Sequence, residues 1–251
     1  MYGFCLLLGI LSAILVGERL CKKHSLETDI FWKAVFYALL FGLLGARLYH
    51  VIHRLDYFTQ RPLETVAVWQ GGLGIWGGIF GGLLGLFVSM RKTGKLLTYV
   101  DVFAVVAPLA QAVGRWGNYF NKELFGYPTN LPWGIYIPQE FRPNNYLYFD
   151  RFHPLFLYES LLNIILFALL YRAYRRRKMW GINLSSGAIS MLYLAGYSIA
   201  RFFLEFMRPE SWKVANFPAA SVVSLIVFML TLPLFSITHI NSNKHQTNFV
   251  I

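Results

Sequence analysis

Long apolar runs separated by short polar segments recur along the whole chain. Seven such runs lie near residues 2–16, 31–51, 71–90, 96–113, 154–171, 187–206 and 217–237. A bilayer-spanning helix needs about 20 mostly apolar residues, and these runs approach that length. Lipid-facing strands would have to close a barrel and would alternate apolar and polar residues over about 10 positions, a pattern not seen here. The sequence therefore predicts an all-α integral membrane protein with about seven transmembrane helices.

The longest connection, approximately residues 118–153, joins the fourth and fifth predicted helices. It is rich in Tyr, Phe and Trp and is interrupted by Pro128, Pro132, Pro138 and Pro143. Proline prevents a continuous helix, and Tyr and Trp favour the depth of lipid headgroups. We expect an extracytoplasmic interfacial arm, which is either an aromatic anchor or a lid over a lipid site.

The chain as a whole, residues 1–251, is expected to form a single polytopic membrane domain. Its apolar runs follow one another without a long soluble insertion, and the residues from about 238 to 251 are polar. Such a terminal segment is expected to fray. We interpret it as a polar cytoplasmic tail.

Composition fits a membrane protein, because 56% of the residues are hydrophobic and 14% are charged, against about 25% charged residues in soluble domains. The formal net charge is +11. No basic run is interleaved with the polar side chains that read nucleic-acid grooves. We therefore predict no nucleic-acid partner and expect anionic lipid to be the partner of the basic residues.

Basic residues are distributed unevenly between the two sides of the predicted bundle. With the amino terminus outside, one side receives Arg19, Lys22, Lys23, Lys33, Arg91, Lys92, Lys95, the basic cluster at 172–178 and Lys244. Cytoplasmic loops carry the excess of Lys and Arg, so the amino terminus is expected outside and the carboxyl terminus in the cytoplasm. The opening segment has no basic leader and no small-residue cleavage site, and we interpret it as the first span rather than a removable signal peptide.

Cofactor motifs are weak in this sequence. Cys5 and Cys21 form no CxxC pair and no cluster at metal-binding spacing, so we predict no disulfide and no metal. Gly72, Gly74 and Gly77 satisfy GxGxxG, but no alternating strand precedes them and no acidic residue follows about 20 positions later. We predict no cofactor.

The same glycine-rich segment has small residues spaced four apart. The pairs are Gly74/Gly78, Gly77/Gly81 and Gly78/Gly82. This spacing lets helix backbones approach closely inside a membrane. It predicts close helix packing for most of these glycines.

Polar side chains within or beside the apolar runs are the candidate chemistry. They are Arg47, Asp101, Arg115, Asn118, Asn121, Glu123, Glu159, Arg201 and Glu205. A charge at mid-bilayer costs about 2.5–3.5 kcal/mol, so such residues either pair inside the bundle or line a functional cavity. Tyr197, Arg201 and Glu205 are spaced four apart and are predicted to share one helix face. Arg201 and Glu205 could neutralise each other, but a guanidinium also suits a lipid phosphate.

The stretch GRWGNYFNKELFG at residues 114–126 is the densest of these segments. Arg115 offers charge to a phosphate, while Asn118 and Asn121 can hold ester or glycerol oxygens. This stretch resembles the signature of the bacterial phosphatidylglycerol–prolipoprotein diacylglyceryl transferase family. The resemblance extends over most of the chain in the same order, through YG at Tyr2, GARLYHV from Gly45, WQGGLGIWGG from Trp69, DVFAVVAP from Asp101, HPLFLYE from His153 and RFFLEFMR from Arg201.

The resemblance implies a seven-helix enzyme of the bacterial inner membrane. Members transfer the diacylglyceryl group of phosphatidylglycerol to the lipobox cysteine of a prolipoprotein, the first step of lipoprotein maturation; a thioether forms and glycerol 1-phosphate leaves. The resemblance also implies the site residues. Catalytic roles fall on Arg115, Asn118, Glu123, Tyr197, Arg201 and Glu205, and substrate binding on Arg115, Asn118, Asn121, Arg201 and Tyr2.

The mechanistic hypothesis is that the arginines hold the phosphate and stabilise the leaving group, while the nucleophile comes from the substrate. A free thiol has a pKa of about 8.5, and cationic surroundings raise its thiolate fraction. Some relatives place a histidine, a candidate base, where this chain has Trp76. Trp76 cannot accept a proton, so His50, His53 and His153 remain alternatives, each more typical of an interfacial or capping residue.

Two other classes of protein remain open from the residues alone. A transporter or lipid-binding membrane protein would line a translocation path with the same buried charges. An alcohol phosphatidyltransferase would need clustered aspartates for a divalent metal, whereas Asp29, Asp56, Asp101 and Asp150 are far apart in the sequence. We therefore expect activity that survives chelation.

Overall fold

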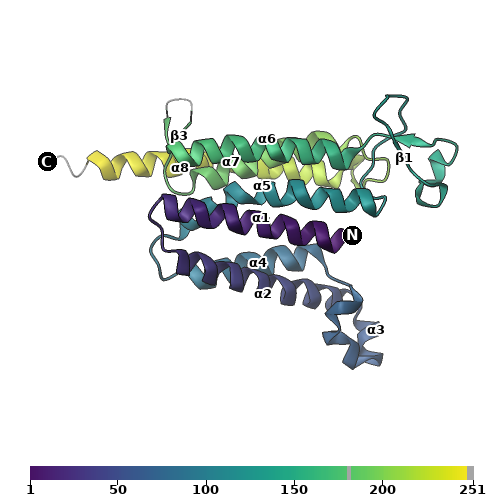
Figure 1. Cartoon of the computed structure of the whole chain (residues 1–251), viewed down its shortest axis with the longest axis horizontal. Coiled ribbons are helices and arrows are strands. Elements are labelled where there is room, and N and C mark those ends of the chain that lie inside the picture. The colour runs from purple at the N-terminus through teal and green to yellow at the C-terminus, as the bar shows by residue number, and fades with distance from the viewer. Residues whose placement is uncertain (180–181, 248–251) are drawn as a thin grey trace. The chain divides into compact units, whose positions relative to one another are not determined.

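The computed structural model describes residues 1–179 and 182–247, with side chains described as far as residue 236. Each of the seven apolar runs forms a helix (Figure 1), which confirms that part of the prediction. The helices are α1 Tyr2–Lys23, α2 Thr28–His53, α4 Ile75–Met90, α5 Leu96–Phe120, α6 Leu155–Arg176, α7 Ala188–Glu205 and α8 Ala219–Thr247.

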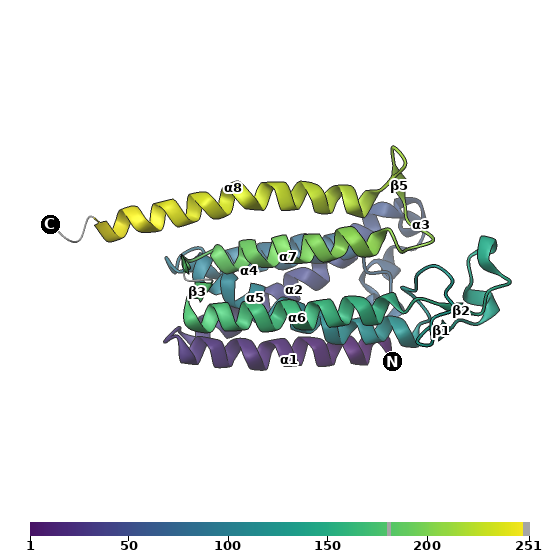
Figure 2. The same cartoon turned by 90° about the horizontal axis from the view of Figure 1, so that it is seen from above.

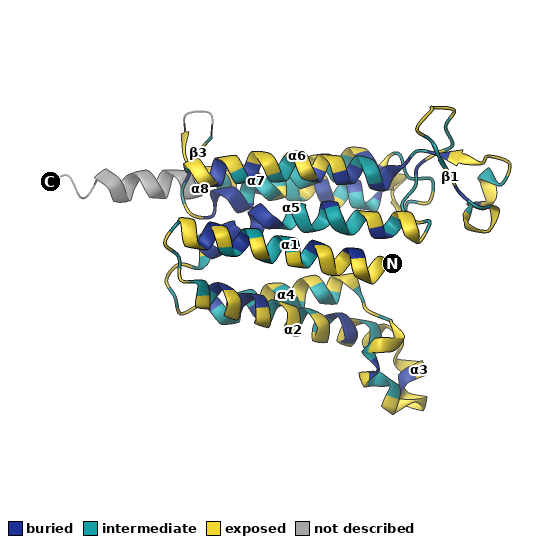
Figure 3. Cartoon of the chain, viewed as in Figure 1, coloured by how far each residue is buried: buried dark blue, intermediate teal, exposed yellow. Residues whose placement is uncertain are grey.

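Five of these helices are long and apolar enough to cross a membrane, namely α1, α2, α5, α6 and the 219–236 part of α8. Helix α4 has 16 residues, and α7 is made less apolar by Arg201 and Glu205. The expectation of an integral membrane protein built from helices is therefore confirmed. Figure 3 shows exposed and buried residues alternating along α6, as expected when one face of a helix packs and another faces lipid.

The largest differences from the predicted helix ends are at the carboxyl-terminal ends of α1, α5 and α8. Helix α1 continues past residue 16 to Lys23, where Lys22 and Lys23 in its last turn complement the helix dipole. Helix α5 continues past residue 113 to Phe120, so the signature stretch begins on a helix. Helix α8 continues to Thr247 rather than fraying after residue 236, and residues 248–251 lie outside the described part of the chain.

The chain divides into two compact units. One contains Met1–Gly17 and the chain from Asp101 onward, and the other contains Glu18–Val100. The boundaries fall inside α1 and α5, so each of these helices contributes to both units.

The Glu18–Val100 unit is built on the packing of α2 against α4. A Cβ at Gly81 would collide with the carbonyl oxygen of Phe41, and one at Gly45 with that of Gly77. At Gly82 it would make only an ordinary contact, 3.7 Å from the Ala38 oxygen. The predicted close approach of helix backbones is confirmed at Gly77 and Gly81.

The connection between α2 and α4 contains α3 Leu55–Gln60 and the 3₁₀ helices η1 Pro62–Val66 and η2 Val68–Gln70. Arg47, which is buried, holds this connection by donating to four backbone carbonyls. Its acceptors are Thr65 at 2.8 Å, Gly71 at 2.7 Å, Gly72 at 3.2 Å and Glu64. Arg47 therefore has a structural role, because its hydrogen bonds fix the connection between α2 and α4.

The other unit contains α6, α7 and α8, with the first part of α1 and most of α5. Figure 2 shows α6, α7 and α8 running alongside one another, and α7 packs against both α6 and α8. Asp101 of α5 caps the start of α7, where it accepts hydrogen bonds from the backbone N–H of Gly187 at 2.8 Å and of Ser190 at 2.9 Å. A carboxylate at a helix N-terminus satisfies donors that have no intrahelical partner.

The segment between α5 and α6 contains no transmembrane helix within the described residues. Strand β1 Ile135–Tyr136 pairs antiparallel with β2 Arg151–Phe152, and the 3₁₀ helices η3 Gln139–Phe141 and η4 Asn144–Tyr146 lie between them. Pro138 and Pro143 directly precede the two turns. The expectation that prolines break this segment is confirmed.

Short strands within the described residues depart from the all-α fold that was predicted. Besides β1 and β2, strand β3 Lys178–Met179 pairs with β4 Ile182–Asn183, and β5 Lys213–Val214 pairs with β6 Phe217–Pro218. Each ribbon lies in a connection between helices. Backbone groups there must pair locally because no helix satisfies them, a requirement that apolar patterning does not reveal.

Candidate functional site

A chain of ion pairs joins three helices of the α5–α8 unit. Arg115 of α5 lies 2.5 Å from Glu159 of α6, whose other carboxylate oxygen lies 3.8 Å from Arg201 of α7. Arg201 also lies 2.5 Å from Glu205, and Arg208 lies 3.6 Å from the same carboxylate. Three arginines thus alternate with two carboxylates.

Arg201 and Glu205 share one face of α7, as their spacing predicted, and the structure pairs them there with both side chains largely buried. Glu205 accepts a further hydrogen bond from Ser211 Oγ at 2.9 Å. The carboxylates are needed because several guanidinium groups buried side by side would otherwise repel one another. The pairing is therefore structural, but it also fixes where each guanidinium points.

Glu159 is the central member of the cluster and was not predicted as a site residue. It was predicted only to lie within an apolar run, and its side chain is 4% exposed. Its position near the start of α6, in the HPLFLYE motif, is the signal that could have placed it. What the sequence did not reveal is that it lies between the two arginines assigned to the phosphate.

A second layer of polar side chains lies one helical turn from the ion pairs. Tyr197 interacts with Arg115, and its ring stacks on Tyr193 with centroids 6.0 Å apart. The Tyr193 hydroxyl accepts a hydrogen bond from Gln111 Nε2 at 2.8 Å. Gln111 precedes Arg115 by four residues on α5, and Tyr193 precedes Tyr197 by four on α7, so the contacts repeat the helical period. Tyr197 thus joins the cluster, as predicted.

The signature stretch turns back on itself where α5 ends. Lys122 adopts φ 56°, in the left-handed region, while its N–H donates to Tyr119 and the N–H of Glu123 donates to Asn118 O at 2.8 Å. These are the two hydrogen bonds of a Schellman motif, in which glycine is the usual left-handed residue. Glu123 is thereby placed over the last turn of α5.

Both asparagines of the signature contact this glutamate. Asn118 Nδ2 donates to Glu123 Oε2 at 3.4 Å, and Asn121 Nδ2 donates to Glu123 Oε1 at 3.5 Å. These are long, exposed hydrogen bonds, which are weak in this geometry. The three side chains are brought together as a group that can exchange partners readily.

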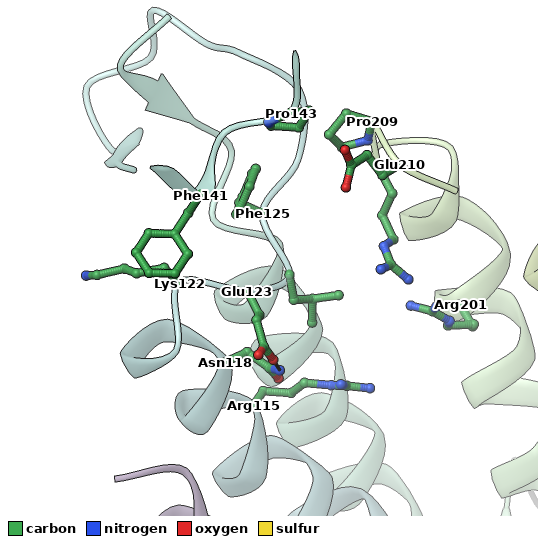
Figure 4. Close-up of a pocket in the computed structure, with 12 residues that line it drawn as sticks. Arg115, Asn118, Lys122, Glu123, Phe125, Phe141, Pro143, Arg201, Pro209 and Glu210 are labelled. Carbon is green, nitrogen blue, oxygen red and sulfur yellow. Dashed lines mark hydrogen bonds between the residues drawn. The ribbon is translucent and has the colours of Figure 1, made fainter. Parts of the chain in front are cut away.

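A cavity of about 530 Å³ opens above the arginines. Figure 4 shows Arg115, Asn118 and Glu123 on one side of it and Arg201 on the other. Its charged lining consists of Arg115, Lys122, Arg201, Arg208, Glu123 and Glu210. Basic groups outnumber carboxylates there, so the cavity suits an anionic ligand.

The remaining sequence candidates lie elsewhere. Tyr2 packs against α5, because a Cβ at Gly117 would approach its ring to 2.7 Å, and Tyr2 does not line the cavity. His153 Nδ1 lies 3.1 Å from the Tyr158 hydroxyl, and that hydroxyl accepts a hydrogen bond from Trp133 Nε1 at 2.8 Å. The contact with Tyr158 therefore gives His153 a structural role.

Trp76, His50 and His53 belong to the Glu18–Val100 unit. Trp76 is half exposed near the start of α4, and His53 stacks on Tyr49. Among the described residues, no group of three or more His, Cys, Asp or Glu side chains is placed to hold a metal ion. Asp101, one of the four aspartates of the chain, is engaged in capping α7.

Comparison with known proteins identifies the family. The model of the prolipoprotein diacylglyceryl transferase family matches residues 1–237. The phosphatidylglycerol–prolipoprotein diacylglyceryl transferase of Fervidobacterium nodosum is 40% identical over 231 residues, which cover 91% of this chain and 77% of that protein. The transferase of Thermotoga maritima is 36% identical over 235 residues, covering 91% and 77%, and transferase 2 of Streptomyces coelicolor is 41% identical over 233 residues, covering 91% and 72%. The chain belongs to the prolipoprotein diacylglyceryl transferase family.

Proposed function

We propose that the chain transfers the diacylglyceryl group from phosphatidylglycerol to the lipobox cysteine of a prolipoprotein, the first step of lipoprotein maturation. The observation that carries this proposal is the cavity of about 530 Å³ whose lining includes Arg115 and Arg201. A guanidinium donates two parallel hydrogen bonds to a phosphate. Phosphatidylglycerol supplies such a phosphate next to the carbon that is transferred.

In the proposed reaction the cysteine sulfur forms a bond to the terminal glyceryl carbon of the diacylglycerol. The bond from that carbon to the phosphate oxygen breaks, and glycerol 1-phosphate leaves with the bonding electrons. The thiol proton is lost in the same process. A thioether and a free phosphate monoester result, so no oxidant and no cofactor are required.

Arg115 and Arg201 stabilise the charge that grows on the leaving phosphate. Both guanidinium groups are held in place before the lipid binds, Arg115 by Glu159 and Arg201 by Glu205. Donors that are already oriented need no reorganisation when charge develops, which is the main source of electrostatic catalysis. The carboxylates are therefore proposed to position the arginines.

Asn118, Asn121 and Glu123 are proposed to bind the glycerol and ester oxygens. Their mutual hydrogen bonds are 3.4–3.5 Å long, so the exchange for a ligand costs little. Tyr197 is proposed to act with Arg115, and Tyr2 to bind substrate near Gly117. The proton acceptor for the thiol is not assigned to a side chain; the cationic lining favours the thiolate.

The arrangement in the membrane is also a proposal. We infer seven spans, including α4 and α7, in the bacterial inner membrane, with the amino terminus outside and the carboxyl terminus in the cytoplasm. Residues 118–153 then form an extracytoplasmic interfacial arm of a single domain, 1–251, and residues 238–251 its cytoplasmic tail. Attaching alkaline phosphatase after residue 236 tests this orientation, because a cytoplasmic end leaves the fusion inactive.

The transfer itself is tested with purified protein, phosphatidylglycerol and a lipobox peptide. We expect the peptide to gain the mass of one diacylglyceryl group, with release of one glycerol 1-phosphate for each peptide modified. The matched control is the same peptide with serine in place of the lipobox cysteine, which should gain no mass. Modification of both peptides alike would contradict a thiol-directed transfer.

A further inference from the structure

Helices α7 and α8 leave two cavities along their contact. The first, of about 170 Å³, is lined by Ser198 and Phe202 of α7 and by Ser224 and Phe228 of α8. Ser198 and Ser224 are the small side chains of this lining, and close packing would normally fill such a space. The space is therefore available to an apolar ligand.

The second cavity, of about 260 Å³, lies further along the same pair of helices. It is lined by Met191 and Ala195 of α7 and by Thr231 and Phe235 of α8. The Thr231 hydroxyl is satisfied within its own helix, since it donates to the Phe228 carbonyl at 2.7 Å. None of the described residues that line either cavity is charged.

The two cavities follow one another along the same pair of helices. The lining positions recur three or four residues apart on each helix, at 191, 195, 198 and 202 on α7 and at 224, 228, 231 and 235 on α8. Residues at this spacing share one face of a helix. We call this line of cavities the α7–α8 seam.

The α7–α8 seam begins beside the arginine cavity. Phe202, in its lining, directly follows Arg201 on α7, and Arg201 lines the arginine cavity. At its other end, Met179, Ile182 and Leu184 of the β3–β4 hairpin form part of the lining. The seam thus runs from the arginine cavity to an apolar end lined by these three side chains.

The length of the seam matches one leaflet of a bilayer. From Phe202 to Met191 along α7 the rise is about 17 Å at 1.5 Å per residue, and half of a hydrocarbon core is about 15 Å thick. The width excludes a peptide helix, because a helix with its side chains is about 10 Å across and neither cavity has the volume for one. A single extended hydrocarbon chain meets both conditions.

The geometry points to the α7–α8 seam as the binding site for one acyl chain of the phospholipid whose phosphate lies at Arg201. Met179, Ile182 and Leu184 close the far end of the site and set the preferred chain length. This inference rests on the proposed function, because the occupant is defined by the lipid substrate. It adds a specificity site distant from the reacting atoms.

A competition assay tests it. Equimolar dioctanoyl- and dipalmitoyl-phosphatidylglycerol are offered together in mixed micelles with the lipobox peptide, and mass spectrometry gives the ratio of the two lipidated products. Ser224→Phe fills the first cavity, and the milder Ala195→Leu fills part of the second. Val223→Phe is the matched control, because Val223 is adjacent to Ser224 but 49% exposed and outside the cavity.

We expect both filling variants to lower the dipalmitoyl-to-dioctanoyl ratio by about tenfold, because each methylene removed from an apolar site weakens binding by roughly fourfold. Val223→Phe should leave the wild-type ratio unchanged. The ratio is measured within one sample, so it does not depend on how much of a variant folds.

The wild-type ratio in both Ser224→Phe and Ala195→Leu would overturn the inference. A raised KM for the peptide with an unchanged lipid ratio would also overturn it, because the seam would then serve the peptide. If the wild-type chain lipidates no peptide at all, the proposed function fails. That outcome is distinct from a failure of the seam.

Discussion

Arg115 Nη2 on α5 lies 2.5 Å from Glu159 Oε1 on α6, and the glutamate side chain is 4% exposed. Residues 44 positions apart in the sequence are thus joined inside the helix bundle. A buried ion pair gains little over apolar packing, but losing one partner leaves an uncompensated charge. The contact therefore makes the position of Arg115 dependent on an acidic residue of another helix.

Glu159→Gln should destabilise the folded protein by about 3–5 kcal/mol, because Arg115 would remain buried without its counterion. The measurement is the midpoint of thermal unfolding in detergent, together with transfer activity at a temperature where the variant is folded. Activity should fall as well, since the guanidinium is no longer held toward the cavity.

The control for Glu159→Gln is Lys22→Ala, which removes an exposed pair between Lys22 and Glu18 at 2.8 Å. Such i,i+4 pairs contribute about 0.3–0.5 kcal/mol, so the unfolding midpoint should barely move. Equal effects of the two substitutions would mean that burial of the Glu159 pair has no energetic consequence.

Gly81→Ala should disrupt the packing of α2 against α4, because the added methyl would collide with the Phe41 carbonyl oxygen. Overpacking of this kind costs about 1–3 kcal/mol. Gly82→Ala is the matched control, since its methyl would lie 3.7 Å from the Ala38 oxygen, an ordinary contact. The midpoints of thermal unfolding of the two variants are compared. Equal midpoints would contradict the close packing of α2 against α4 at Gly81.

Asp101→Ala should lower stability by at least about 2 kcal/mol, since hydrogen bonds to a charged acceptor contribute about 1.5–3 kcal/mol each. It removes the acceptor for the Gly187 and Ser190 N–H groups and for the Ser190 hydroxyl at 2.7 Å. Asp56→Ala, at an exposed position of α3, is the control. Hydrogen exchange at the start of α7 measures the effect, and unchanged protection there would refute the capping role.

Transfer should continue in EDTA, because the proposed charge stabilisation comes from Arg115 and Arg201 rather than from a divalent cation. The initial rate of peptide lipidation is measured before and after chelation, and again after magnesium is added back. A rate that is lost in EDTA and restored by magnesium would require a metal site and a different account of the cavity.

Much of the fold follows from apolar patterning. All seven helices could be located in advance because each is a long apolar run, and the pairing of Arg201 with Glu205 follows from their spacing within one helix. The close contact of α2 with α4 likewise follows from glycines spaced four apart. These are local properties, which a sequence displays directly.

The part that sequence did not reveal depends on how helices are aligned with one another. Glu159 lies between two arginines only because of how α6 is aligned along its axis with α5 and α7. Asp101 caps α7 for the same reason, across 86 residues of sequence. The turn at Lys122 was missed because a left-handed residue there is usually glycine.

The central claim is that Arg115 and Arg201 hold the phosphate of the lipid substrate. Its most direct test is the single-turnover rate of peptide lipidation by purified, monodisperse Arg115→Ala and Arg201→Ala, with Arg61→Ala as an exposed control. We predict a loss of at least about 100-fold for each of the first two, in the range seen when a charge-stabilising donor is removed, and a wild-type rate for the control. A wild-type rate in either Arg115→Ala or Arg201→Ala would contradict the account.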